Sequence, residues 1–265
     1  MEIINRPENR EIYLCCIAKN EDPYIQEWID YHFKIGFEKI FIFANDWEYK
    51  NDDERIKVFD IKGGRQQEEA YNRFLRGNRN KFWWVAFWDV DEFLVLHKHK
   101  NIEELLLEND HRQALAIHWA RFGSNGHEKV VNNNYNVLKR FTRRGSEEDH
   151  NGPFKPPSHF TDAHIKTIMR FTNPHRMGVH NCSGTAHTPA GRAVKDSAWT
   201  SKVDWSIAQL NHYWIKSLEE AKIKLERGRA TTGVKRDWNN HFMLIDKRSN
   251  TVEDLSAIKF FYDLK

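Results

Sequence analysis

Short apolar runs alternate with longer amphipathic segments through the first half of the chain. An apolar run bounded by turn-forming residues predicts a strand, and apolar residues that recur every three or four positions predict a helix. By this criterion the strands are expected at residues 11–18, 39–44, 55–61 and 114–119, with a further strand that begins at Trp83 and runs into three acids. The helices are expected at residues 24–35, 66–76 and 102–108. Strands that alternate with helices at these lengths indicate an α/β fold with a mainly parallel, mixed sheet and helices on both faces.

The second half of the chain has a different pattern. Residues 143–162 and 183–201 are rich in Gly, Pro, Ser and charged residues, which predicts loops. Residues 164–171 alternate as in a strand, for which an antiparallel pairing is open, and residues 217–227 predict a helix with Ser217 as its N-cap. Because no Pro/Gly/Ser-rich linker divides the 265 residues, we expect a single domain over residues 1–265.

Composition narrows the class of protein. The 41 basic and 38 acidic residues give a net charge of +3, which is too balanced for nucleic acid or an acidic membrane as the main partner. Ten Trp and an aromatic content of 13% supply large apolar surfaces, so we expect a folded protein. The first eleven residues are polar and no run approaches the roughly 18 apolar residues of a spanning helix. The expected location is therefore the cytoplasm, either free or attached to the inner face of the membrane.

The three cysteines suggest neither disulfides nor a zinc site. Cys15 and Cys16 are adjacent in a predicted strand and Cys182 is alone, so their spacing builds neither arrangement. We expect them to be small buried apolar residues.

The most informative segment is the run from Trp83 to Leu96, in which apolar residues lead directly into Asp89, Asp91 and Glu92. An apolar run of this kind is typical of a strand buried on both faces, where unpaired carboxylates are costly. The acids are therefore expected at the carboxyl end of the strand, the edge at which open α/β sheets bind ligands. Strand geometry points Asp89 and Asp91 to the same side, toward one divalent ion that also binds diphosphate oxygens. This predicts a nucleotide-sugar site.

Two other interpretations of the acidic segment stay open. In the first, the acids cap a neighbouring helix or pair with arginines and bind no ligand. In the second, the segment is a motif of the haloacid-dehalogenase phosphatases, which it also resembles. In those enzymes an apolar strand ends in Asp-x-Asp-x-Thr/Val and the first Asp is the nucleophile. Two facts count against the phosphatase interpretation. The fourth position of the motif is Glu92, and a complete half-domain precedes the motif.

Polar residues at the ends of the first two strands should lie at the same sheet edge. They are Lys19, Asn20 and Glu21 after the first strand and Asp46 after the second. Their carboxylate and amide groups could bind a base and ribose hydroxyls, with Lys19 near phosphate. For each single residue, helix capping is an equally good explanation. The prediction of a binding site therefore rests on the four residues as a group.

Among the 14 histidines, His212 is the best candidate for a further ligand. It follows an apolar stretch and precedes a predicted helix, far enough along the chain to return to the sheet edge. A neutral imidazole there could complete an oxygen-rich Mn²⁺ or Mg²⁺ site. His180 competes for the same role.

The segment from Trp119 to Glu128 leaves the fifth strand through Gly123 and Gly126, which would let the backbone approach a ligand closely. Trp119 could stack on a sugar ring, and His127 or Glu128 could act as the base on an acceptor hydroxyl. The alternatives are a core tryptophan and a solvent-exposed glutamate.

With these residues in view, the chain resembles glycosyltransferase family 92 and family 2-like proteins of the glycosyltransferase A fold, from Tyr13 to about Gly228. A series of motifs in the family's order is far more specific than a lone Asp-x-Asp. The matching segments are Ala18–Glu21, Glu27-Trp28, Tyr31-His32, Gln67 with Ala70–Asn72, Trp84–Phe87, Asp89–Leu94, Phe122–Ser124, Gly126-His127, Lys166–Arg170, His180, Asn211–Tyr213, Lys216-Ser217, Lys224 and Arg227-Gly228.

The resemblance implies a metal-dependent, inverting transfer of a sugar from a nucleotide diphosphate sugar to a hydroxyl of a glycan or lipid-linked saccharide, in glycan or cell-surface polysaccharide synthesis. Residues 11–119 would be the nucleotide-sugar-binding half and residues 120–265 the acceptor and metal-completing half. The resemblance implies that Asp89 and Asp91 hold ribose and metal, with Asp46 and Asn20 near the base. Together with the residue patterns above, the expected ligands of Mn²⁺ or Mg²⁺ are Asp89, Asp91 and His212, and the expected donor-binding residues are Lys19, Asn20, Glu21, Asp46, Gln67 and Asp89.

One departure from the family pattern concerns the catalytic base. Lys139 stands where relatives often show an acid before an aromatic residue such as Phe141. If that acid is catalytic, either His127 or Glu128 replaces it or the protein is impaired. A phosphohydrolase and a noncatalytic nucleotide-sugar-binding protein are the alternative functions.

Overall fold

A computed structural model describes residues 6–8, 10–152, 163–170, 176–227 and 242–263. Its main element is a mixed sheet of ten strands, in which one path runs in the order β10-β9-β6-β8-β4-β1-β2-β3 and β11 links β6 to β5. The strands on the path are β1 (Glu11–Ala18), β2 (Lys39–Asn45), β3 (Ile56–Ile61), β4 (Phe82–Phe87), β6 (Ala114–Arg121), β8 (Ile165–Arg170), β9 (Thr185–His187) and β10 (Ala193–Lys195). The fold is therefore mixed α/β with a large sheet, as predicted.

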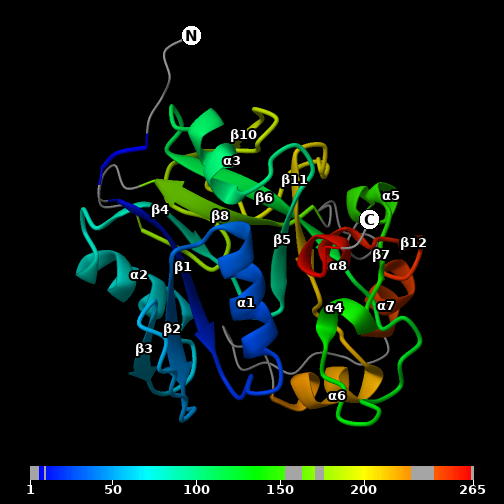
Figure 1. The fold of residues 1–265 in the computed structure, drawn as a ribbon. Coiled ribbons are helices and arrows are strands. Elements are labelled where there is room, and N and C mark those ends of the chain that lie inside the picture. The colour runs from blue at the N-terminus through cyan, green and yellow to red at the C-terminus, as the bar shows by residue number, and fades with distance from the viewer. Residues whose placement is uncertain (1–5, 9, 153–162, 171–175, 228–241, 264–265) are drawn as a thin grey trace.

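The β4-β1-β2-β3 part of the sheet is entirely parallel and has helices on both faces. Alternate residues of β1 enter two separate cores: Leu14 packs with α1 (Ile25–Ile35), and Cys15 packs with α2 (Gln67–Gly77). Figure 1 shows α1 in front of β1. Gly36 ends α1 in the left-handed conformation, with φ of 111°, which a glycine adopts without steric cost. The alternation of strands and helices in this half was predicted from the sequence and is confirmed.

The strand predicted to begin at Trp83 is confirmed as β4, which ends at Phe87, so the acids follow its carboxyl end as expected. The second strand of this segment was not predicted: β5 (Glu92–Leu96) begins after a turn and pairs antiparallel with β11 (Ala208–His212) instead of continuing in the main path. The turn is closed by Glu92, whose backbone N donates to the Asp89 carbonyl oxygen at 3.0 Å and whose Oε2 accepts from the Asp89 backbone N at 2.9 Å. The two aspartates are therefore turn residues, and strand alternation does not set their directions.

In the second half, β6 pairs antiparallel with β8 and parallel with β11. The predicted helix at residues 217–227 is confirmed as α6 (Leu218–Arg227), and its N-cap is Ser217, whose Oγ accepts from the Glu220 backbone N at 3.3 Å. The predicted loops are partly wrong. Residues 143–152 contain β7 (Arg143–Arg144) and α5 (Glu147–Asn151), residues 183–201 contain β9 and β10, and residues 153–162 lie outside the described residues. In α5, Ser146 and Asp149 form a complete capping box.

Short elements complete the part of the chain that the structure describes. They are α3 (Ile102–Glu108), α4 (Val137–Arg140), α7 (Leu244–Arg248), β12 (Val252–Glu253) and α8 (Ser256–Phe261), with β12 paired to β7. All three cysteines are free and buried, as expected. No helix among the described residues is long and apolar enough to span a lipid bilayer.

Candidate active site

The carboxyl ends of β1, β2 and β4 meet at one edge of the sheet, because these three strands run parallel. Asn20 follows β1 and Asp46 follows β2, and both have positive φ, at 55° and 45°. Lys19 Nζ lies 3.1 Å from Asp46 Oδ2 and joins the two strand ends. The structure thus brings together the first two strand ends that the sequence grouped at this edge, with backbone conformations that are uncommon outside glycine.

Asp89, the first aspartate, is held on both carboxylate oxygens. Gln67 Nε2, at the start of α2, donates to Oδ1 at 2.8 Å, and Lys166 Nζ on β8 donates to Oδ2 at 2.9 Å. The Asp89 side chain nevertheless keeps 32% of its surface exposed. Its carboxylate is therefore fixed in direction while part of it stays open to a ligand.

Asp91, the second aspartate, faces a different set of partners. Its Oδ1 lies 3.4 Å from His212 Nε2 at the end of β11, and its Oδ2 accepts from Lys224 Nζ of α6 at 2.7 Å. Burial opposes ionisation of this carboxyl, but the Lys224 ammonium and the His212 imidazole outweigh it and hold the pKa of Asp91 well below its usual range. Asp91 is therefore a carboxylate at neutral pH.

The juxtaposition of Asp91 and His212 follows from strand pairing. In the antiparallel β5–β11 ladder, Glu92 is the register partner of His212, so the residue before Glu92 lies beside the end of β11. Burial lowers the pKa of His212, which favours the neutral imidazole. Its Nδ1 is buried and has no hydrogen-bond partner within the described ranges.

Glu92 and Lys166 form a buried pair beneath the two aspartates. Both side chains are fully buried, and Lys166 Nζ lies 3.6 Å from Glu92 Oε1. Burial raises the pKa of Glu92 well above its usual range, whereas the neighbouring carboxylates overcome burial and raise the pKa of Lys166. The Lys166 charge is therefore directed mainly at Asp89. Glu92 serves to close the turn and does not reach the surface.

Sequence reasoning assigned no role to Lys166 or to Lys224, although both lay within the family resemblance. A signal existed for Lys166, which stands in an apolar strand where a charged residue needs a partner. Lys224 gave no local signal, because it is one of several charged residues on α6.

Trp119 lies at the centre of three imidazoles. Its ring stacks on His164 with centroids 5.1 Å apart and contacts the His180 and His212 rings at 5.0 and 4.1 Å. Burial lowers the pKa of His180 well below its usual range, with Lys166 as the next largest cause. Trp119 is partly buried and its ring lies between His180 and His212, the two histidines considered as metal ligands. The His164 ring already covers one face of the Trp119 ring.

His127 and Glu128, the two candidate bases, lie on the loop between β6 and α4. His127 Nε2 donates to the Arg140 carbonyl oxygen at 2.9 Å, and Glu128 is exposed. Among the described residues, neither side chain forms a hydrogen bond or an ion pair with Asp89 or Asp91. Lys139, the departure from the family pattern, places its ammonium 4.2 Å from the centre of the Tyr262 ring.

Gly123 does not leave room for a ligand. A Cβ built there would lie 2.4 Å from Asn250 Nδ2, and the Gly123 backbone N donates to the Ser249 carbonyl oxygen at 2.9 Å. The expectation that its backbone would approach a ligand is thus corrected: the close neighbour is the segment after α7. Gly126, with φ of 76°, has no neighbour within 4 Å of such a Cβ.

Glu21 and Lys216 extend the site toward α1. Lys216 Nζ lies 3.5 Å from Glu21 Oε2 and 3.3 Å from the centre of the Tyr24 ring. Lys216 also has positive φ, at 58°, which is uncommon for a long side chain. Its ammonium lowers the pKa of Asp91 as a minor cause, which places it within electrostatic reach of the aspartate turn.

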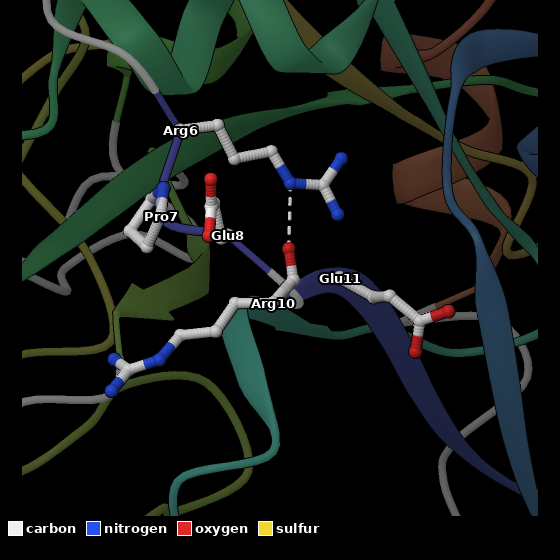
Figure 2. Close-up of a pocket in the computed structure, with 5 residues that line it drawn as sticks. All are labelled: Arg6, Pro7, Glu8, Arg10 and Glu11. Carbon is white, nitrogen blue, oxygen red and sulfur yellow. Dashed lines mark hydrogen bonds between the residues drawn. The ribbon is translucent and has the colours of Figure 1, made fainter.

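Two hollows lie at opposite ends of the parallel strands. A cavity of about 900 Å³ lies beside Asp46, lined also by Trp47, Tyr49, Val58 and Asp60, and the Trp47 and Tyr49 rings stack 4.5 Å apart. Figure 2 shows the other hollow, where Arg6 Nε donates to the Arg10 carbonyl oxygen at 2.6 Å. The second hollow lies at the amino end of β1, away from the aspartates, so the cavity beside Asp46 is the one that adjoins the site.

The residues present fit one divalent ion held by two protein groups. Ligands about 2.1 Å from an ion at neighbouring octahedral positions are about 3 Å apart, and Asp91 Oδ1 and His212 Nε2 are separated by 3.4 Å. Within the described ranges, no three His, Cys, Asp or Glu side chains are grouped closely enough to hold an ion. Asp89 is directed toward Gln67 and Lys166, so among the described residues Asp91 and His212 are the two groups spaced to share one ion.

A parallel half-sheet with an acidic turn at its carboxyl edge defines an α/β protein with charged side chains gathered at that edge. The glycosyltransferase family 92 model matches residues 11–246, so the chain belongs to glycosyltransferase family 92. This confirms the resemblance drawn from the motifs.

Curated relatives support the same assignment. A glycosyltransferase family 92 protein of Ricinus communis is 24% identical over 87% of this chain and 40% of its own length. A family 92 protein of Oryza sativa subsp. japonica is 24% identical over 63% of this chain and 32% of its own. The chain thus spans less than half the length of these relatives. Among solved structures, a 4-diphosphocytidyl-2C-methyl-D-erythritol synthase from Anaerococcus prevotii overlaps 62% of this chain and 73% of its own, with 8% identity and a TM-score of 0.30, too little to support an inference.

Proposed function

We propose that this chain transfers a sugar from a nucleotide diphosphate sugar to a hydroxyl group of a glycan or lipid-linked acceptor. The observation that carries the proposal is the aspartate turn at the carboxyl edge of a parallel sheet, with His212 beside Asp91 and a lysine on each aspartate. Membership in glycosyltransferase family 92 supports the same reaction class.

The proposed donor site runs from the cavity beside Asp46 to Asp91. The cavity, with its stacked Trp47 and Tyr49 rings, has room for a base. Asp89 is fixed by Gln67 and Lys166 and is partly exposed, which suits it to accept a hydrogen bond from a ribose hydroxyl. Lys19, Asn20 and Glu21 complete the edge between these two groups.

Asp91 and His212 are the residues proposed to hold Mn²⁺ or Mg²⁺. A bound divalent ion would supply positive charge to the diphosphate as the bond between sugar and phosphate breaks. The ammonium groups of Lys216 and Lys224 lie near Asp91 and add to that positive potential. An environment of fixed charges of this kind stabilises a leaving group without rearranging during the reaction.

In the proposed reaction an acceptor oxygen attacks the anomeric carbon on the face opposite the diphosphate. The bond to the diphosphate oxygen breaks, the nucleoside diphosphate leaves with that electron pair, and the configuration of the sugar inverts. The acceptor proton passes to a base, for which His127 and Glu128 remain the predicted residues. The proposed role is in glycan or cell-surface polysaccharide synthesis on the cytoplasmic side of a membrane.

The test is donor binding by the Asp91→Asn variant. With Mn²⁺ present, we expect one of UDP, GDP, ADP or CDP to raise the melting temperature of the wild-type protein, because a ligand that binds only the folded form stabilises it. Asp91→Asn should lose this shift. Asp30→Asn, an equal charge change at an exposed position on α1, should retain it. Unchanged nucleotide binding by Asp91→Asn would refute the proposed site.

Turnover distinguishes the two alternative functions. A phosphohydrolase would release phosphate from simple phosphomonoesters, which we do not expect, because membership in glycosyltransferase family 92 favours sugar transfer. A noncatalytic binding protein would bind the nucleotide sugar and release no nucleoside diphosphate with any acceptor.

A further inference from the structure

Lys224 binds one carboxylate oxygen of Asp91, the proposed metal ligand. Its Nζ donates to Asp91 Oδ2 at 2.7 Å and to the Trp214 carbonyl oxygen at 3.0 Å. Figure 1 shows α6, which carries Lys224, at the end of the molecule toward which β1 and β2 run. The ammonium is thus fixed by two oxygens, one of which belongs to the acidic turn.

This contact divides the Asp91 carboxylate between two partners. Oδ2 is taken by Lys224, and Oδ1 faces His212 Nε2. An ion at this place can therefore use one oxygen of Asp91 and one imidazole nitrogen, and the carboxylate cannot bind it through both oxygens while Lys224 stays. Two protein ligands leave most of the coordination shell of an octahedral ion unfilled.

The charges at the site also disfavour a metal ion that arrives without a nucleotide. The negative charge of Asp91 is already opposed by the Lys224 ammonium, and Asp89 is likewise opposed by Lys166. A divalent ion arriving alone would meet a site whose carboxylates are compensated and whose nearest ammonium repels it. A nucleoside diphosphate brings both negative charge and oxygen ligands, so it removes both obstacles at once.

We propose that Lys224 is a positioning residue that holds Asp91 as a one-oxygen ligand and prevents the protein from retaining a metal ion without a nucleoside diphosphate. This inference rests on the proposed function, because it assumes that Asp91 and His212 bind the ion. It adds that Lys224, through its contact with Asp91, makes retention of the ion depend on the nucleoside diphosphate.

The experiment measures Mn²⁺ binding by the full chain in the absence of nucleotide, from the electron paramagnetic resonance signal of free Mn²⁺. Removing an ammonium a few ångströms from a divalent ion should tighten binding about tenfold or more, even with the screening of bulk water. We therefore expect Lys224→Met to bind Mn²⁺ alone at least about tenfold more tightly than the wild type. Lys222→Met is the matched control, because it removes the same charge from an exposed position on the same helix, and it should change the affinity less than about twofold.

A second readout separates this role from a structural one. At saturating Mn²⁺, the affinity of Lys224→Met for the nucleoside diphosphate that stabilises the wild type should be equal or lower, because a positive charge has been lost. A lysine that only supports the fold would weaken both measurements when replaced. Lys224→Gln, which can still donate to both oxygens, should tighten Mn²⁺ binding as Lys224→Met does, and it serves if the methionine variant does not fold.

The outcomes separate the inference from the function on which it rests. Unchanged or weaker binding of Mn²⁺ alone by both Lys224 variants would overturn the inference, as would tight binding of Mn²⁺ alone by the wild type. If the wild type binds none of UDP, GDP, ADP and CDP with Mn²⁺ present, the proposed function itself fails. If it binds one of them and the Lys224 variants gain no metal affinity, only the role of Lys224 fails.

Discussion

Replacing Glu27 with Gln should abolish the loss of folding stability that ionisation of the Glu27 carboxyl causes as the pH rises. Glu27 lies on α1, and its Oε2 accepts from the Val137 backbone N at 2.6 Å at the start of α4. Its Oε1 is buried and without a hydrogen-bond partner in the part of the chain that the structure describes. Burial raises the pKa of Glu27 from its ordinary value of 4.5 to about 7, although backbone donors at Val137 and Leu138 oppose the change.

The magnitude follows from the two pKa values. Each pH unit of difference between folded and unfolded states is worth about 1.36 kcal/mol, so the difference between 4.5 and about 7 corresponds to about 3 kcal/mol. Because the pKa is higher in the folded state, this stability is fully present below pH 4.5 and is lost as the pH rises through about 7. The wild type should therefore lose about 3 kcal/mol relative to Glu27→Gln between about pH 4.5 and about pH 8.

Urea unfolding at several pH values measures this difference directly. The free energy of unfolding of Glu27→Gln minus that of the wild type should rise with pH by about 3 kcal/mol. Any cost of burying the amide nitrogen of Gln is independent of pH in this range, so it leaves the slope unchanged. Asp30→Asn, an exposed change on the same helix, should give a flat difference. A flat or falling difference for Glu27→Gln would refute the reasoning, because it would mean that the carboxyl ionises in the folded protein as easily as in water.

Two further predictions concern packing. Gly123→Ala should lower the free energy of unfolding by about 1–3 kcal/mol, since its Cβ would overlap Asn250; Gly64→Ala, with no neighbour within 4 Å, should change it by less than about 1 kcal/mol. Equal urea midpoints for wild type and Gly123→Ala would contradict the close contact. The three cysteines should be unreactive toward Ellman's reagent in the folded protein and all react after denaturation, because burial raises the pKa of Cys15 and Cys16 well above the usual range and that of Cys182 to about 11. Rapid labelling of any native thiol would contradict their burial.

The parallel half of the fold could be predicted because each element carries its own signal. β1 and β2 are short apolar runs, and α1 combines helical spacing with a terminal glycine at Gly36. These signals are local, so they survive without knowledge of the tertiary structure. The order of strands and the pairing with β8 depend on contacts between distant segments and were not accessible in the same way.

The turn between β4 and β5 escaped prediction because it is itself buried. Trp88 and Val90, which flank Asp89, are almost completely inaccessible to solvent. Turns are usually recognised by polar residues, Gly or Pro, and this one offers only two aspartates within an apolar run. The hydrophobic pattern therefore continues through the turn and does not indicate that a second strand, β5, begins after the acids.

The location of the acids at the carboxyl end of a strand could be predicted from the sequence. The lysines that pair with them could not. The position of Asp89 and Asp91 follows from the cost of burying unpaired carboxylates inside an apolar strand and from the rule that open α/β sheets bind ligands at the carboxyl ends of their strands. The lysines that meet them are 77 and 133 residues away in sequence, and no local pattern distinguishes Lys224 from its neighbours on α6. Long-range ion pairs of this kind are decided by how the second half of the chain packs.

His212 shows how the two kinds of information combine. The sequence could indicate a return to the sheet edge after residue 210, because an apolar stretch ends there before a helix. It could not indicate that β11 would lie between β6 and β5, with His212 in register with Glu92 and Arg121. This pairing is possible only because the chain turns at Asp89–Asp91, since one continuous strand would have carried Glu92 away from β11. The turn that was missed is thus the reason that the predicted carboxylate and the predicted imidazole lie 3.4 Å apart.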